Sequence, residues 1–200
     1  MYSQISNLVS ALDKCGALSQ ASVRAAIEDF AACLEDEDYR THMLGELALR
    51  LAEARNFEEA EGIVRRLLGL EKSSFLTKVA DIEARVGRSD RATSLYDDAA
   101  SAALEQRFPA QQSQAIAAVA QSVERYGKWD TAANFWHKAV ELAQSAQSKG
   151  GTDGPEAAGV LLEAVEAFCS HGDRASAEKI ARSINIEDLR HRALEKVSHS

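Results

Sequence analysis

The histidines and cysteines are the side chains of this chain that could bind a metal ion or act as nucleophiles. The five histidines are scattered, and none shares a helix face with another His or a Cys at the spacing that zinc ligands use. His171 and Cys169 lie two residues apart, a poor separation on a helix for one shared ion. The fold could still bring a distant Cys and His together as a nucleophile pair, but no local signature in the sequence predicts one. We therefore expect no metal, no cofactor and no catalytic activity.

The cysteines also bear on the compartment. Cys15, Cys33 and Cys169 are odd in number and far apart, which is typical of small buried thiols in a reducing compartment and not of a disulfide framework. The first residues lack a basic leader, and no apolar run approaches the roughly 20 residues that cross a bilayer. We expect a cytoplasmic protein without a membrane segment.

Two further stretches have compositions that ligand sites use. The segment "KGGTDG", residues 149–154, follows no predicted strand and lacks the Lys-Ser or Lys-Thr of a phosphate-binding loop, so we interpret it as a linker. The acidic run "EDED", residues 35–38, lacks the spacing of a calcium loop and is expected to end one helix and begin the next. A net charge of -8 repels phosphate backbones, so nucleic acid is not an expected partner.

The composition favours helices. The chain is 46% hydrophobic and 27% charged, which suffices for a buried core. Ala is abundant, Pro numbers 2 and aromatic residues are 6%, whereas strands prefer branched and aromatic side chains. We expect an all-α protein with almost no strand.

A five-residue interval from Gly to Ala recurs along the chain and indicates a repeat. It joins Gly16 to Ala21, Gly87 to Ala92, Gly127 to Ala132 and Gly172 to Ala177, while the copy "ARNFEEA" keeps Ala60 but has Arg55 in place of Gly. Apolar columns precede each Ala by 16, 13, 12 and 9 residues; the first holds Ile5, Leu44, Leu76, Ile116 and Leu161, and the second Leu8, Leu47, Val79, Val119 and Ala164. Offsets of three, four and seven residues form one stripe on a helix. Glu83 is the one misfit, in the column that otherwise holds Leu12, Leu51, Val123 and Phe168.

The repeated unit is therefore predicted to be a helical hairpin. Its first helix has one apolar face and ends at a Gly that can adopt positive φ. An acid, such as Glu58, Asp90 or Asp130, then stands in the first turn of the second helix, where the helix dipole favours negative charge. The small Ala lets the two helices approach closely.

These residues resemble the tetratricopeptide repeat. The best unit carries Ile116, Val119, Ala120, Val123, Gly127, Trp129, Ala132, Trp136 and Ala139 at the family's intervals. The resemblance implies a right-handed α-solenoid of about five hairpins plus a C-terminal capping helix. Successive Ala anchors lie 39, 32, 40 and 45 residues apart, where the family has a regular 34.

We expect one repeat domain over residues 1–200, with units at 2–34, 38–70, 73–106, 110–147 and 156–184, a flexible break at 148–155 and a cap at 188–198. The expected helices span 2–14, 19–34, 38–54, 57–70, 73–86, 89–106, 110–126, 129–147, 156–170, 173–184 and 188–198. Trp129 and Trp136 fall in repeat columns, so we interpret them as core residues and not as an aromatic ligand box.

The resemblance also implies that the first helices of successive hairpins line a concave groove. Projected from the apolar stripe, the candidate groove residues are His42, Leu49, Asp81, Arg85, Gln114, Gln121, Glu124, Arg125 and Glu166. Arg85 and Arg125 hold equivalent places in adjacent units, where they either contact a partner or pair with Asp81 and Glu124 on their own helices. The Lys and Asn clamp of the family's chaperone-binding members is absent from these places.

We therefore expect a noncatalytic adaptor that binds a peptide or helix of a partner protein in this groove. Two alternatives stay open: a structural protein that assembles with copies of itself, and a helical-repeat sensor of a small ligand or signalling peptide.

Overall fold

The computed structural model describes residues 2–69, 71–149 and 154–199, with side chains described for 7–69, 71–148 and 154–199. These residues form helices and no strand, which confirms the all-α prediction for the described part of the chain. The α-helices are α1 (Tyr2–Lys14), α2 (Ala21–Ala32), α3 (Glu37–Glu53), α4 (Phe57–Arg65), α5 (Lys72–Arg85), α6 (Ser89–Leu104), α7 (Pro109–Arg125), α8 (Trp129–Lys149), α9 (Gly154–Ser170), α10 (Arg174–Ser183) and α11 (Glu187–His199).

Most helices begin and end within two residues of their predicted bounds. The clearest exception is α4, which ends at Arg65 although the pattern continues to residue 70. Gly69 has a φ of 76°, which a right-handed helix does not allow, and the Thr41 hydroxyl donates to the carbonyl of Leu68 at 2.7 Å, so a tertiary bond holds the segment after α4. Before α2, residues 17–19 form a 3-10 helix. Helices α8 and α9 extend into the predicted break, whose residues 150–153 lie outside the described residues.

Several helices begin at the acids that the sequence places there. The Asp36 carboxylate accepts the backbone N–H of Asp38 at 2.9 Å and of Tyr39 at 3.2 Å, and so caps α3. The acidic run therefore begins α3, as predicted, but it does not end the preceding helix, because α2 already ends at Ala32. Asp90 and Asp130 stand in the first turns of α6 and α8.

A left-handed residue stands at the turn of every predicted hairpin. Its φ is 72° at Gly16, 65° at Arg55, 86° at Gly87, 71° at Gly127 and 78° at Gly172. In the last four turns the next residue donates its N–H back to the helix, as Asn56 does to the carbonyl of Leu51 at 2.8 Å. This 6→1 bond, with a 5→2 bond beside it, is the Schellman motif. Arg55 thus adopts the conformation that Gly takes elsewhere.

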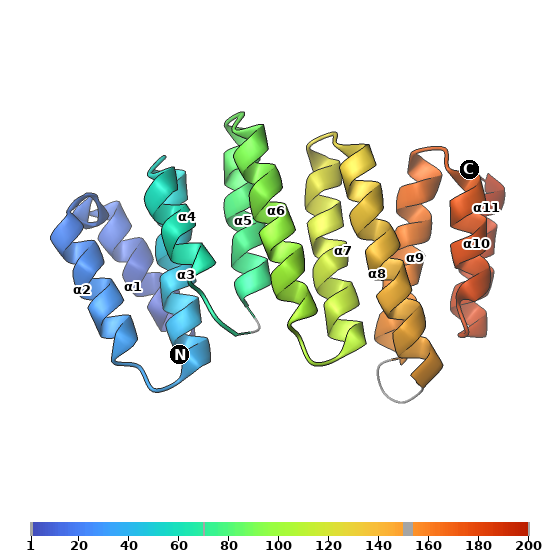
Figure 1. Ribbon diagram of the computed structural model, residues 1–200, viewed down its shortest axis with the longest axis horizontal. Coiled ribbons are helices and arrows are strands. Elements are labelled where there is room, and N and C mark those ends of the chain that lie inside the picture. Colours follow the sequence, from blue (N-terminus) through green and yellow to red (C-terminus); the bar gives the residue numbers. More distant parts are fainter. Residues whose placement is uncertain (1, 70, 150–153, 200) are drawn as a thin grey trace. The chain divides into compact units, whose positions relative to one another are not determined.

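The chain divides into two compact units, residues 1–102 and 103–200. In the first, α3 packs against α1, α2, α4 and α5. In the second, α7 packs against α8 and α9, and α9 also packs against α10 and α11. Within each unit the helix pairs follow one another in chain order, with α2 outside α1 (Figure 1), and the first helices of successive pairs touch one another.

The apolar columns form the core of both units, except that Leu44 on α3 is half-buried and that the first hairpin is less buried. Leu47, Leu76, Ile116 and Leu161 are fully buried, as are the anchors Ala60, Ala92, Ala132 and Ala177. In contrast, the side chain of Leu8 is 50% exposed and Ala21 is exposed, so the weakest predicted unit is also the least buried. The side chain of Ile5 lies outside the described ones.

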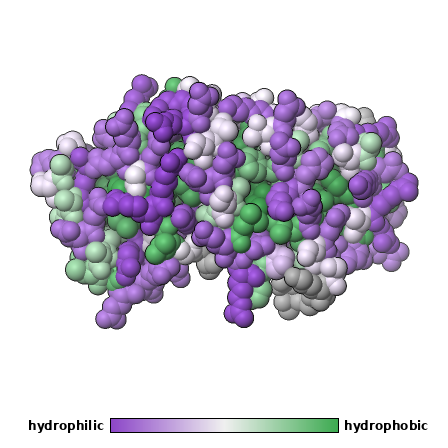
Figure 2. Space-filling model, in the orientation of Figure 1, coloured by the Kyte–Doolittle hydropathy of each residue, from purple (hydrophilic) through white to green (hydrophobic). Residues whose placement is uncertain are grey.

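Helix α11 packs on α9 and α10 through Ala193 and Val197, while Leu194 is exposed. Figure 2 shows hydrophilic side chains over most of the visible face, with hydrophobic ones gathered in patches. No helix within the described ranges is long and apolar enough to cross a membrane.

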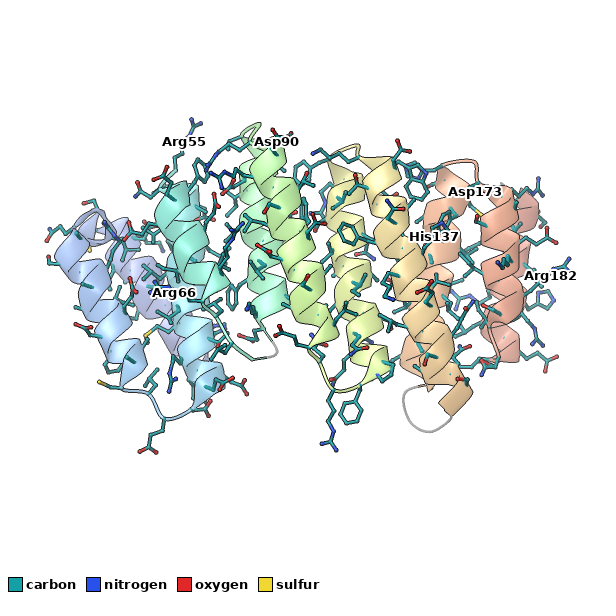
Figure 3. The ribbon with its side chains drawn as sticks, viewed as in Figure 1. Arg55, Arg66, Asp90, His137, Asp173 and Arg182 are labelled. Atoms are coloured by element: carbon teal, nitrogen blue, oxygen red, sulfur yellow. The ribbon has the colours of Figure 1, made fainter. Side chains whose placement is uncertain are left out.

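Arg55 carries a backbone strain that Gly would relieve. It projects from the turn between α3 and α4 (Figure 3). We expect Arg55→Gly to raise the free energy of unfolding by up to about 1 kcal/mol, because a left-handed conformation is unfavourable for a residue with a Cβ. Gly87→Arg, at the equivalent turn, is the matched reverse change and should lower stability by a similar amount. Urea unfolding followed by circular dichroism measures both; two changes of the same sign would contradict the assignment.

Gly45 in α3 is required by the packing of Phe75 from α5. A Cβ at Gly45 would lie 2.5 Å from three ring carbons of Phe75, whereas a Cβ at Gly62 in α4 would meet nothing within 4 Å. We expect Gly45→Ala to lower the free energy of unfolding by about 1–3 kcal/mol through overpacking. Gly62→Ala should raise it by about 0.5–1 kcal/mol, because Ala favours a helix. Equal stability of the two variants in urea unfolding would show that Phe75 does not constrain α3.

Candidate functional site

A surface depression in the second unit holds two of the predicted groove residues. It has a volume of about 460 Å³ and lies where the first helices α7 and α9 pack together. Its lining residues are Gln114, Ala118 and Gln121 from α7 and Glu156, Gly159, Val160 and Glu163 from α9. Because residues seven apart lie on one face of a helix, each helix presents one polar stripe here.

The spacing of the polar side chains is the same on both helices. Gln114 and Gln121 are seven residues apart on α7, and Glu156 and Glu163 are seven apart on α9. The Gln121 amide donates to the Glu163 carboxylate at 3.0 Å. Ala118 and Gly159 are small, so the lining between these two levels is not filled by bulky side chains. The result is a depression with amides on one wall and carboxylates on the other.

The depression is electrostatically negative. Burial raises the pKa of the Glu163 carboxyl, the neighbouring charge of Glu166 raises it further, and the hydrogen bond from Gln121 lowers it. Glu166 itself forms an ion pair with Lys196 of α11 at 2.7 Å. A positive group placed here would stabilise the ionised form of Glu163. The arrangement therefore suits a cationic or N–H-bearing ligand.

The predicted groove residues of the first unit are largely engaged within that unit. His42 Nδ1 lies 3.1 Å from a carboxylate oxygen of Glu71, and its ring meets Phe75 edge-on with centroids 5.8 Å apart. Asp81 accepts a 2.7 Å hydrogen bond from the hydroxyl of Tyr96. Leu49 is half-buried and Arg85 is exposed in the last turn of α5; these two complete the predicted set in the first unit.

The remaining predicted residues of the second unit lie away from the depression's lining. Glu124 accepts a 3.3 Å hydrogen bond from the indole of Trp136 and lies 3.5 Å from His171 Nδ1. Arg125 is exposed in the last turn of α7, and Glu166 pairs with the capping helix. Of the set predicted in this unit, Gln114 and Gln121 are the two that the fold brings to one concave place.

An aromatic cluster surrounds Glu124 where α7, α8 and α9 meet. Trp129 stacks on His171 with centroids 3.8 Å apart and meets Phe168 edge-on at 5.3 Å. Trp136 is 1% exposed, which confirms its predicted core position. Trp129, which was also predicted in the core, is only half-buried and stacks on His171, an exposed residue. Figure 3 marks His137, whose ring lies 4.9 Å from Phe168.

This cluster does not form a nucleophile relay. The Ser170 hydroxyl, at 3.0 Å, and the Glu124 carboxylate, at 3.5 Å, both approach the same ring nitrogen of His171. A relay needs the hydroxyl and the acid on opposite nitrogens. All three cysteines are free thiols, but Cys15 and Cys33 are exposed and Cys169 is half-buried, so the prediction of buried thiols is wrong. Over the described residues, no three His, Cys, Asp or Glu side chains gather as a metal site would require.

Sequence reasoning missed the carboxylate wall of the depression. The sequence predicted Glu166 as the groove residue of α9. The face of α9 that lines the depression carries Glu156 and Glu163 instead. The signal was present: Gln114 and Glu156, like Gln121 and Glu163, are 42 residues apart, so polar pairs recur in register on two first helices. This spacing predicts a shared site only if the face of α9 that packs near α7 is known, and packing determines that face.

Glu124 is expected to stabilise the second unit through the buried indole. In Glu124→Ala the N–H of Trp136 loses its acceptor inside the core, which should lower the free energy of unfolding by about 1–3 kcal/mol. Tryptophan fluorescence during urea unfolding reports this directly, since both Trp residues lie in α8. Glu141→Ala, on an exposed face of α8, is the control and should change stability by less than about 0.5 kcal/mol. A Glu124→Ala protein as stable as the control would contradict this role.

Comparison with known proteins leaves the chain without a family assignment. A scan against protein-family models and a search of the curated proteins give no match. The tetratricopeptide resemblance therefore rests on the recurring residues of the sequence and stays a prediction.

Proposed function

We propose that the protein is a noncatalytic interaction module that binds an extended, positively charged segment of a partner protein. The observation that carries this proposal is the depression between α7 and α9, with its amide wall and its carboxylate wall. We infer that it belongs to a groove lined by first helices, as in tetratricopeptide solenoids. The contacts of α1 with α3, of α3 with α5 and of α7 with α9 support this inference within each unit.

The lining suits peptide recognition. An extended backbone offers N–H and C=O groups at regular intervals, and side-chain amides such as those of Gln114 and Gln121 can both donate to it and accept from it. A Lys or Arg side chain of the partner would meet Glu156 and Glu163 on the other wall. Because the lining stands on helices that pack on one another, the ordering entropy falls mainly on the partner.

Selection of random peptides tests the proposal even though the partner protein is not identified. We expect peptides displayed on phage and selected on the whole chain to be enriched in Lys and Arg. The double variant Gln121→Ala, Glu163→Gln should bind the selected peptides at least about tenfold more weakly in isothermal titration, because it removes a polar and a charged contact worth about 1.5–3 kcal/mol.

Glu141→Gln is the matched control for that experiment. It neutralises an exposed carboxylate on α8, outside the depression, and should leave peptide affinity unchanged. Peptides selected without any excess of basic residues would refute the proposed charge preference. Selected peptides that bind the double variant and the wild-type chain equally well would refute the site.

Self-assembly is a second candidate, favoured by one observation in the first unit. The apolar side chains of Leu8 in α1 and Phe30 in α2 are 50% and 55% exposed. Large apolar side chains that are exposed close together often mark a surface that another protein surface covers. Light scattering across a concentration series separates the candidates: a constant monomer mass supports the binding module alone, and a rising mass that Phe30→Ser abolishes supports assembly through this face.

A further inference from the structure

A fully buried carboxyl lies at a core position of the first unit. Glu83, on α5, is 0% exposed. It stands nine residues before its Ala anchor, in the column where other hairpins bury Leu51, Val123 and Phe168. Among the described residues neither of its carboxylate oxygens has a hydrogen-bond partner. An ionised carboxylate in this state is unfavourable, because burial removes its hydration without supplying donors. The site therefore needs a further explanation.

A second carboxyl faces Glu83 from the neighbouring helix. Glu61 of α4 is only 7% exposed. A hydrogen bond between the two acids raises the pKa of Glu83. Two ionised carboxylates have no donor, so this bond forms only when one carboxyl, here Glu83, is protonated. A proton on Glu83 would therefore supply the donor that the buried pair lacks.

Arginines surround the pair without hydrogen-bonding Glu83. Arg88 Nη1 lies 3.5 Å from Glu83, and Arg88, Arg91 and Arg65 lie 3.6, 3.7 and 3.9 Å from Glu61. These are ion-pair distances beyond ordinary hydrogen bonds.

The charged groups near the pair are also engaged elsewhere. Arg65 pairs with Asp98 at 3.1 Å, and the Arg88 guanidinium lies over the ring of Phe57 at 4.5 Å. On α3, Arg50 and Glu53 pair with each other at 2.8 Å. Of the described groups, those that act on the pKa of Glu83 are Glu61, Arg88 and Arg91.

The pair also lies at a structurally sensitive place. The Glu83 carbonyl accepts the N–H of Arg88 at 3.0 Å in the Schellman turn between α5 and α6. Such turns commonly have an apolar contact between these two positions. Here the Glu83 carboxyl and the Arg88 guanidinium, 3.5 Å apart, occupy these two positions, so the charge state of Glu83 acts directly on the turn that joins two helices.

We propose that Glu61 and Glu83 hold one shared proton inside the first unit, and that losing this proton loosens the packing of α4, α5 and α6. Burial, the charge of Glu61 and the hydrogen bond to Glu61 raise the pKa of Glu83 to about 7, against the opposing charges of Arg88 and Arg91. The folded unit therefore keeps a proton that the unfolded chain releases at lower pH. Its stability falls as the pH rises from the ordinary carboxyl pKa to about 7, and is constant above that value.

Hydrogen exchange followed by mass spectrometry measures the effect in the full chain. Tryptophan fluorescence would not report it, because both Trp residues lie in the second unit. After correction for intrinsic exchange, amides of α5 and α6 that exchange through opening of this unit should exchange about tenfold faster at pH 8 than at pH 6, the ratio expected for one proton held with a pKa of about 7. Amides of α9 serve as the internal reference.

Three variants identify the group. Glu83→Gln keeps the shape and a permanent donor, so it should remove the tenfold difference and exchange slowly at both pH values. Glu61→Gln should move the step to lower pH, because the like charge is gone. Asp97→Asn is the control: it replaces a largely exposed acid of α6, whose pKa is raised by partial burial and by the charge of Asp98, and it should keep the full difference. The proposal is overturned if wild-type exchange does not change with pH, or if Glu83→Gln exchanges faster than wild type at pH 6.

Discussion

Each hairpin depends on one residue in the left-handed conformation between its two helices. That residue turns the chain back, and in four turns the 6→1 and 5→2 bonds satisfy carbonyls that would otherwise end the first helix without partners. The second helix then packs back on the first, and in the last four hairpins a buried Ala, five residues after the turn, allows close approach. The stripe of apolar residues on the first helix follows the same register. Without the turn, these faces would not meet.

Arg55 shows how strongly this constraint acts. The turn between α3 and α4 keeps the left-handed geometry and both backbone bonds although its residue has a Cβ. The surrounding contacts, among them the buried Leu51 and Ala60 on either side, must therefore outweigh the strain of the Arg backbone. The geometry belongs to the hairpin, and glycine is the residue that adopts it with least strain.

The polar residues discussed above lie in different environments in the two units. In the second unit, Gln121 and Glu163 face solvent across a depression and suit contact with another molecule. In the first, Glu83 takes an apolar position in the core, where its oxygens have no hydrogen-bond partner among the described residues and Arg88 lies 3.5 Å away. The polar side chains thus lie at the surface in the second unit and, at Glu83, in the core of the first, where burying a charge costs more.

The helices, the turns and the Ala anchors could be predicted from the order of residues alone, because they follow from local spacing and from conformational preferences of single residues. The same pattern marked Glu83 as the one misfit. The rotation of each helix against its neighbours could not be predicted in this way: Glu156 and Glu163 line the depression while Glu166 pairs with Lys196, and Trp136 is buried while Trp129 is not. A helix of 3.6 residues per turn presents many faces, and the choice among them depends on packing between residues distant in sequence.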